Sequence, residues 1–304
     1  MRLILNYIRR YFQEVDKKIL ALTSLLGGGL IFLNYFFKMD SWISGHHSFM
    51  INFVCRYFIF LIAFVLPYLL YLLFNKKNYF NSSLFIFLIL IAPGIFSLKV
   101  ALNIPLHFTD KSDWNNYWNQ VFYWPVLLVI VVLILFIIWK SFYKDESFFG
   151  ATINNFQWKP YLLMLLIMLP LISLASTQPD FQNMYPKLKL ITGVYAESNL
   201  HWWHKLLFEL SYGSDFIGIE LFFRGFLILA FIKWVGKDAI LPMACFYCTI
   251  HFGKPLGECI SSYFGGMILG IVVYNTRSIV GGLMVHLGIA WMMEIGGYIG
   301  NAIK

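Results

Sequence analysis

Ionisable side chains interrupt three apolar stretches in the last third of the chain. Glu220 and Arg224 occur in the run Gly-Ile-Glu-Leu-Phe-Phe-Arg-Gly, and their spacing of four residues places them on one face of a helix. His251 ends a second apolar run, and His286 lies within a third. A carboxylate and a histidine can together activate a water molecule for hydrolysis by general-base catalysis. Ionisable groups are costly at bilayer depth, so these four residues are candidate catalytic residues.

The same residues also allow simpler explanations. Glu220 and Arg224 could form a self-neutralising buried ion pair, and a single histidine in an apolar helix more often serves as a hydrogen-bonding residue between helices. Two histidines in addition to the Glu–Arg pair favour the catalytic interpretation. Glu258 follows His251 by seven residues, so it lies on nearly the same helical face and could supply a second carboxylate.

A metal site is the related alternative. Two histidines and a carboxylate are sufficient ligands for zinc, with a water molecule in the fourth position. The chain has no His-Glu-x-x-His spacing that would strengthen this alternative. We therefore expect no metal or other cofactor, with zinc as the less favoured possibility.

Cys245-x-x-Cys248 resembles half of a metal or redox motif, but no second pair accompanies it, and we expect a structural role.

The elements that position these residues are predicted from composition. Hydrophobic residues make up 60% of the 304 residues and charged residues 12%, whereas soluble domains carry about 25% charged residues. Apolar stretches of about 18 to 25 residues recur along the chain, long enough to cross a bilayer as helices. The alternating pattern of a membrane β-barrel is absent. The sequence predicts an all-α integral membrane protein, a polytopic bundle of eight or nine transmembrane helices.

Three regions follow from this pattern. Residues 1–18 form a basic amphipathic segment at the membrane surface, residues 19–204 contain N-terminal transmembrane helices and loops, and residues 205–304 form an intramembrane core with the candidate site. The expected spans are 19–37, 50–74, 80–98, 120–142, 160–176, 205–232, 238–251, 258–274 and 279–298.

The charges predict an orientation and exclude one class of partner. The formal net charge is +8, but the basic residues are scattered between apolar spans, so we expect the lipid bilayer and no nucleic acid as a partner. With the N-terminus in the cytoplasm, the short basic loops at 76–77, 140–159, 233–237 and Arg277 all lie on the cytoplasmic face, in agreement with the positive-inside rule. The long loops 99–119 and 177–204 then face outward. We expect the cytoplasmic (inner) membrane of a bacterium.

The segment from about 205 to 298 resembles the CAAX-protease and bacteriocin-processing family of intramembrane endopeptidases, also called CPBP or Abi. That family has a Glu-Glu-x-x-x-Arg motif, then Phe-x-x-x-His, then His-x-x-x-Asn or Asp. Glu220-x-x-x-Arg224, His251 and His286 match these motifs in order. The sequence departs from them at three positions, which are Ile219 for the first glutamate, Tyr247 for the phenylalanine and Ala290 for the final amide or acid.

The resemblance implies hydrolysis of a peptide bond in a membrane-associated protein or peptide. In this chain Glu220 is then the general base, positioned by Arg224, with His251 as its partner and His286 as the oxyanion donor. Ile219 and Ala290 keep open a second possibility, a non-catalytic family member (a pseudo-protease) that binds a partner protein. A small-solute transporter fits the helix count, but the two halves lack paired, Gly/Pro-interrupted helices.

Overall fold

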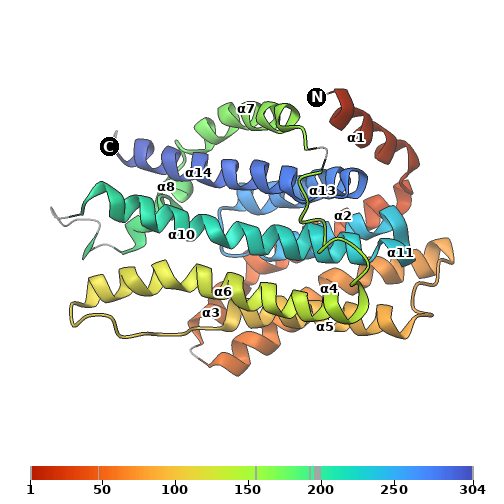
Figure 1. Ribbon diagram of the computed structural model, residues 1–304, viewed down its shortest axis with the longest axis horizontal. Coiled ribbons are helices and arrows are strands. Elements are labelled where there is room, and N and C mark those ends of the chain that lie inside the picture. Colours follow the sequence, from red (N-terminus) through yellow and green to blue (C-terminus); the bar gives the residue numbers. More distant parts are fainter. Residues whose placement is uncertain (1, 47, 155, 192, 195–199, 303–304) are drawn as a thin grey trace.

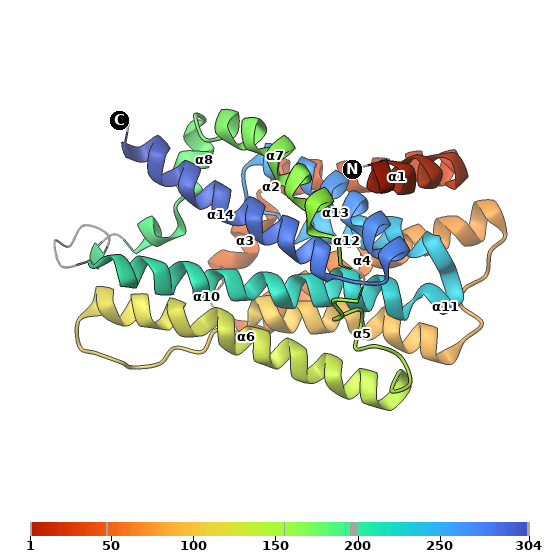
Figure 2. The same cartoon turned by 45° about the horizontal axis from the view of Figure 1, so that its top comes forward.

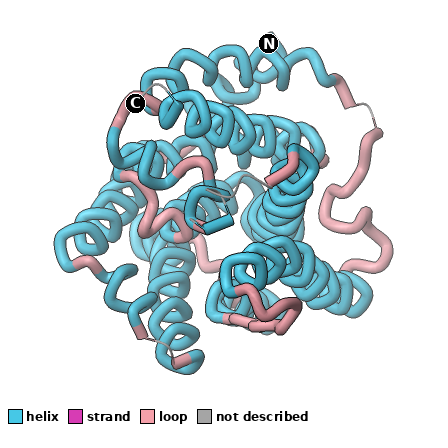
Figure 3. Tube along the Cα trace, turned by 90° about the vertical axis from the view of Figure 1, so that its left-hand side faces the viewer, coloured by secondary structure: helices cyan, strands magenta, loops and turns pink. Residues whose placement is uncertain are grey.

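The computed structural model describes residues 2–46, 48–154, 156–191, 193–194 and 200–302, and this part of the chain is helical with no strand. Figure 3 looks along the bundle and shows helices joined by loops. Among the described residues seven helices are long and apolar enough to cross a membrane, which confirms the predicted fold class. They are α2 (Lys17–Phe37), α4 (Phe49–Asn75), α5 (Ser83–Ala101), α6 (Ser112–Phe142), α7 (Trp158–Ala175), α13 (Leu256–Thr276) and α14 (Val280–Ala302) (Figure 1).

A further long element carries the first candidate residues. Helix α10 (Trp202–Glu220) continues directly into the π-helix η2 (Leu221–Ala230), because Glu220 and Leu221 both keep right-handed helical backbone angles. Together they are long enough to cross a hydrocarbon core of about 30 Å. Figure 2 shows α10 lying between α6 and α14, and both helices contact it. Nearly all side chains of η2 are buried.

Helix α12 (Ile240–Thr249) is shorter than the expected span 238–251. Its ten residues rise only about 15 Å, and all of them are buried. The chain then turns through residues 250–255, where Gly253 has a φ of 83°, before α13 begins. Non-helical backbone at membrane depth is tolerated where protein surrounds it. This turn holds His251, so the short helix places the histidine inside the bundle.

Short elements flank or connect the long helices. Helix α1 (Arg2–Glu14) buries Ile4 and Tyr11 and exposes its arginines. The Lys237 ammonium lies 2.8 Å from the Glu14 carboxylate and, with Arg10, lowers the pKa of Glu14 to about 2. The remaining short elements are α3 (Met39–Gly45), α8 (Pro179–Met184), η1 (Lys187–Leu190), α11 (Ile232–Val235) and η3 (Gly236–Ala239).

The segment expected as an outward loop, 177–204, folds partly into the bundle. Tyr185 and Leu188 are buried, and the Lys187 backbone N–H donates to the Glu294 carboxylate on α14 at 2.8 Å. Residues 192 and 195–199 of this expected loop lie outside the described residues. Apolar side chains and a satisfied backbone donor allow the segment between α7 and α10 to pack inside the protein. It therefore reaches the side of the bundle where the turn at 250–255 lies.

Gly225 in η2 offers a test of this packing. A side-chain carbon at this position would lie 2.6 Å from the Phe149 carbonyl oxygen, which is backbone and cannot move aside easily. We expect Gly225→Ala to lower the stability by about 1–3 kcal/mol, measured as thermal unfolding in detergent. Gly265→Ala is the matched control, because nothing lies within 4 Å of its added carbon. Equal melting temperatures for the two variants would contradict the packing of η2.

Candidate active site

Glu220 and Arg224 form the buried centre of the site. Glu220 is the last residue of α10, Arg224 lies in η2, and neither side chain has any exposed surface. The Arg224 Nη1 atom lies 3.0 Å from the Glu220 Oε1 atom. π-helical turns are rare and occur frequently at functional sites. The positive charge beside the carboxylate offsets part of the cost of burying it.

His286 on α14 contacts the same carboxylate oxygen. Its Nδ1 atom lies 2.7 Å from Glu220 Oε1, and its Nε2 atom lies 3.0 Å from the Tyr247 hydroxyl. With Nδ1–H donating to the carboxylate, Nε2 accepts from the tyrosine, so the two hydrogen bonds assign one tautomer. Both ring nitrogens of His286 are therefore engaged.

The second oxygen of the carboxylate is free of protein hydrogen bonds. Glu220 Oε2 is buried and has no hydrogen-bond partner among the described residues. It faces Gly282 on α14, where a side-chain carbon would lie only 2.8 Å from it. The absence of a side chain at Gly282 leaves space beside this oxygen. One oxygen of Glu220 is thus anchored, and the other remains available as an acceptor.

Tyr247 on α12 joins the parts of the site. The Arg224 guanidinium carbon lies 4.0 Å from the centre of the Tyr247 ring, a cation–π arrangement. The Tyr247 hydroxyl reaches His286, and its backbone oxygen lies 3.1 Å from His251 Nδ1. The sequence analysis treated Tyr247 only as a replacement for phenylalanine. Its position four residues before His251, hence on the same helical face, was the signal that could have identified it.

His251 lies on the far side of Tyr247 from the carboxylate. The centres of the Tyr247 and His251 rings are 4.8 Å apart. No hydrogen bond among the described residues joins His251 to Glu220 or His286. The structure thus brings Arg224 and His286 into direct contact with Glu220. His251 instead contacts Tyr247, which in turn contacts Arg224 and His286. Within the described part of the chain, His251 is therefore not a hydrogen-bond partner of the carboxylate.

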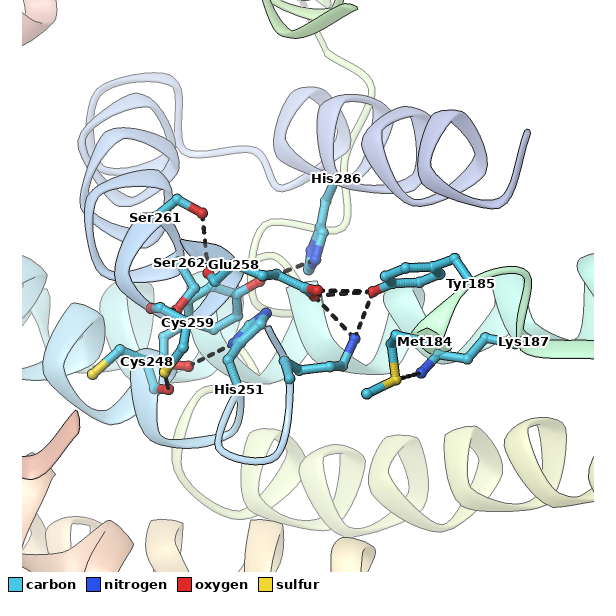
Figure 4. Close-up of polar contacts among 12 residues, drawn as sticks. Met184, Tyr185, Lys187, Cys248, His251, Glu258, Cys259, Ser261, Ser262 and His286 are labelled. Carbon is cyan, nitrogen blue, oxygen red and sulfur yellow. Dashed lines mark hydrogen bonds and ion pairs between the residues drawn. The ribbon is translucent and has the colours of Figure 1, made fainter. Parts of the chain in front are cut away.

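A second polar cluster adjoins His251. The Lys254 ammonium lies 3.0 Å from Glu258 Oε1 and 2.9 Å from the Tyr185 hydroxyl. That hydroxyl also lies 3.1 and 3.0 Å from the two Glu258 oxygens. Figure 4 shows Tyr185, Glu258, His251 and His286 gathered in one region. Glu258, expected as a second carboxylate, is therefore near the site but bonded to a lysine and a tyrosine.

Two further sequence features have positions in the structure. The described residues include no group of three or more His, Cys, Asp and Glu side chains close enough to hold one metal ion. Cys245 and Cys248 are buried free thiols, and the Cys248 sulfur donates to the Cys245 carbonyl oxygen at 3.1 Å. This hydrogen bond stays within α12, so the pair fills the core.

A large cavity lies away from these residues. It has a volume of about 1160 Å³ and is lined by α4, the α5–α6 connection, α6 and η1, with polar side chains such as Arg56, Asn116, Gln120 and Lys187. None of the four candidate catalytic residues lines it. The candidate site is instead an enclosed polar cluster between α10, η2, α12 and α14.

Comparison with known proteins identifies the domain that holds this cluster. Residues 203–292 match the family model described as type II CAAX prenyl endopeptidase Rce1-like. No curated protein and no solved structure matched the chain. The matched region contains Glu220, Arg224, His251 and His286, and it is consistent with the CPBP resemblance. The chain is thus a polytopic membrane protein whose residues 203–292 are similar to type II CAAX prenyl endopeptidases of the Rce1-like family.

Proposed function

We propose that this protein is an intramembrane endopeptidase that hydrolyses a peptide bond in a membrane-associated protein or peptide. The observation that carries the proposal is the buried Glu220 carboxylate inside the Rce1-like domain. Its Oε1 atom is held by Arg224 and His286, while Oε2 has no hydrogen-bond partner in the described part of the protein. A positioned carboxylate with one open oxygen is suited to act as a general base.

The proposed reaction uses Glu220 Oε2 to take a proton from a water molecule. The resulting hydroxide attacks the peptide carbonyl carbon, the C–N bond of the tetrahedral intermediate breaks, and Glu220 returns the proton to the leaving amine. Arg224 and His286 hold the carboxylate in place. Because both nitrogens of His286 are engaged, we assign His286 to positioning Glu220 and not to the oxyanion.

A non-catalytic role remains the second candidate, and two buried residues favour it. Ile219 and Ala290 are apolar and buried at positions where the family motifs carry polar side chains. A protein with this cluster could bind a membrane partner without cleaving it. The two functions differ in one measurable respect, because only the endopeptidase needs the Glu220 carboxylate for turnover.

Glu220→Gln tests the endopeptidase directly. The purified protein in liposomes would be offered two internally quenched peptides, one farnesylated with a C-terminal CAAX sequence and one carrying a transmembrane helix. We expect wild type to cleave at least one of them, and Glu220→Gln to lower turnover by about 100- to 10,000-fold with substrate binding retained. Glu146→Gln, which changes an exposed carboxylate, is the control and should behave as wild type. Cleavage by neither protein would replace this proposal with partner binding, and equal cleavage by both would show that Glu220 is not the general base.

The Glu220–Arg224 pair predicts a stability change. Arg224→Met leaves an uncompensated buried carboxylate and should destabilise the protein by about 3–5 kcal/mol. The double variant Glu220→Gln, Arg224→Met removes both charges and should recover much of that loss, which thermal unfolding in detergent would measure. If Arg224→Met melts at the wild-type temperature, the ion pair does not stabilise this fold.

We also propose that the N-terminus lies in the cytoplasm of a bacterium. Lys144 follows α6 and Asp110 precedes it, so the two mark opposite ends of a 31-residue helix. In a Cys55→Ser background, Lys144→Cys should react with a membrane-impermeant maleimide only from the cytoplasmic side, and Asp110→Cys only from outside. The reverse pattern would invert the topology.

A further inference from the structure

The proposed hydrolysis needs a hydrogen-bond donor for the negative oxygen of the tetrahedral intermediate. Preorganised donors at that oxygen usually make the largest single contribution to such a reaction. The two positions expected to supply one do not. Both ring nitrogens of His286 are bonded to other side chains, and Ala290 carries no polar group. A hydrolase with this site must therefore use a different donor.

Arg224 has donors that the protein leaves unused. A guanidinium carries five N–H groups and no acceptor. The Nε, Nη1 and Nη2 atoms of Arg224 are all buried, and none of them has a hydrogen-bond partner in the described part of the chain. The 3.0 Å contact between Nη1 and Glu220 Oε1 is thus an ion pair without the alignment of a hydrogen bond. Buried donors without acceptors are costly, and a catalytic role is one explanation for them.

These donors lie directly beside the proposed base. Arg224 follows Glu220 by four residues, and it touches the same carboxylate whose Oε2 atom is buried without a partner among the described residues. The guanidinium carbon lies 4.0 Å from the centre of the Tyr247 ring. This cation–π contact holds the guanidinium in place but supplies no lone pair to its N–H groups. An unused acceptor and unused donors therefore adjoin one another, as an attacking water and the carbonyl oxygen of its target require.

We propose that Arg224 donates to the oxyanion of the tetrahedral intermediate, in addition to pairing with Glu220. The inference rests on the proposed endopeptidase function. When hydroxide adds to the peptide carbonyl carbon, the π electron pair moves onto the oxygen, and an Arg224 N–H donates a hydrogen bond to it. When the C–N bond breaks, that pair returns to re-form the carbonyl of the carboxylic acid, and the amine leaves with the proton from Glu220. Arg224 keeps its own protons throughout.

Removal of the Glu220 carboxylate separates the two roles of Arg224. In a Glu220→Gln background there is no charged base left for the arginine to position. The probe is the peptide that wild type cleaves, with its scissile amide replaced by a phosphinate, which is an uncleavable tetrahedral anion. Such analogues gain contacts that form only in the transition state. The same peptide with its ordinary amide measures binding of the planar ground state.

We expect Arg224→Met, added to Glu220→Gln, to weaken binding of the phosphinate peptide by about 100- to 1,000-fold. Binding of the amide peptide should change little. Arg224→Lys keeps the charge but not the planar fork, so its phosphinate affinity should lie between the two. Lys254→Met in the same background is the matched control and should retain phosphinate affinity. Its ammonium is bonded to Glu258 and Tyr185, and no ion pair among the described residues joins it to Glu220.

The outcomes separate this inference from the function on which it rests. Equal phosphinate affinity with and without Arg224 would overturn the inference, as would an equal loss for both peptides or an equal loss with Lys254→Met. Thermal unfolding checks each variant. Should the methionine variant fail to fold, Arg224→Lys and Arg224→Gln decide, since the inference requires tighter phosphinate binding with lysine. If wild type cleaves neither quenched peptide, the function and the inference are both wrong. If it cleaves one and only the phosphinate comparison fails, the endopeptidase stands.

Discussion

Burial of the Glu220 carboxylate is the constraint around which this bundle is organised. Glu220 has no exposed surface, and a charge in such a place is strongly unfavourable without partners. Three different elements supply them. Arg224 comes from η2, His286 from α14, and Tyr247 from α12 links the arginine to the histidine. The relative positions of these helices are therefore fixed by the need to compensate one charge.

The same constraint explains the irregular backbone nearby. The π-helix η2 begins directly after Glu220 and buries Arg224, while α12 stops after ten residues and places His251 and Lys254 on a turn inside the protein. Non-helical backbone at this depth is acceptable because the surrounding helices cover it. Arg224, His251 and Lys254 therefore lie on the π-helix η2 and on the turn after α12, where the backbone departs from a regular α-helix.

The sequence was sufficient for the parts that depend on local spacing. Apolar stretches predicted the membrane helices, and the interval of four residues predicted that Glu220 and Arg224 share a helical face. The role of Tyr247 and the insertion of Tyr185 could not be predicted, because both depend on how separate helices rotate against one another. The expected span 238–251 exceeded α12 by two residues at each end, because residues 238–239 belong to η3 and the chain turns from Ile250.

The central claim is that Glu220 Oε2 acts on a water molecule in the space beside Gly282. Gly282→Ala would place a carbon 2.8 Å from this oxygen and fill that space. The direct measurement is kcat for peptide hydrolysis by Gly282→Ala in liposomes, alongside its thermal unfolding. The account predicts a large loss of kcat in a protein that still unfolds cooperatively. Wild-type kcat in a folded Gly282→Ala protein would contradict it.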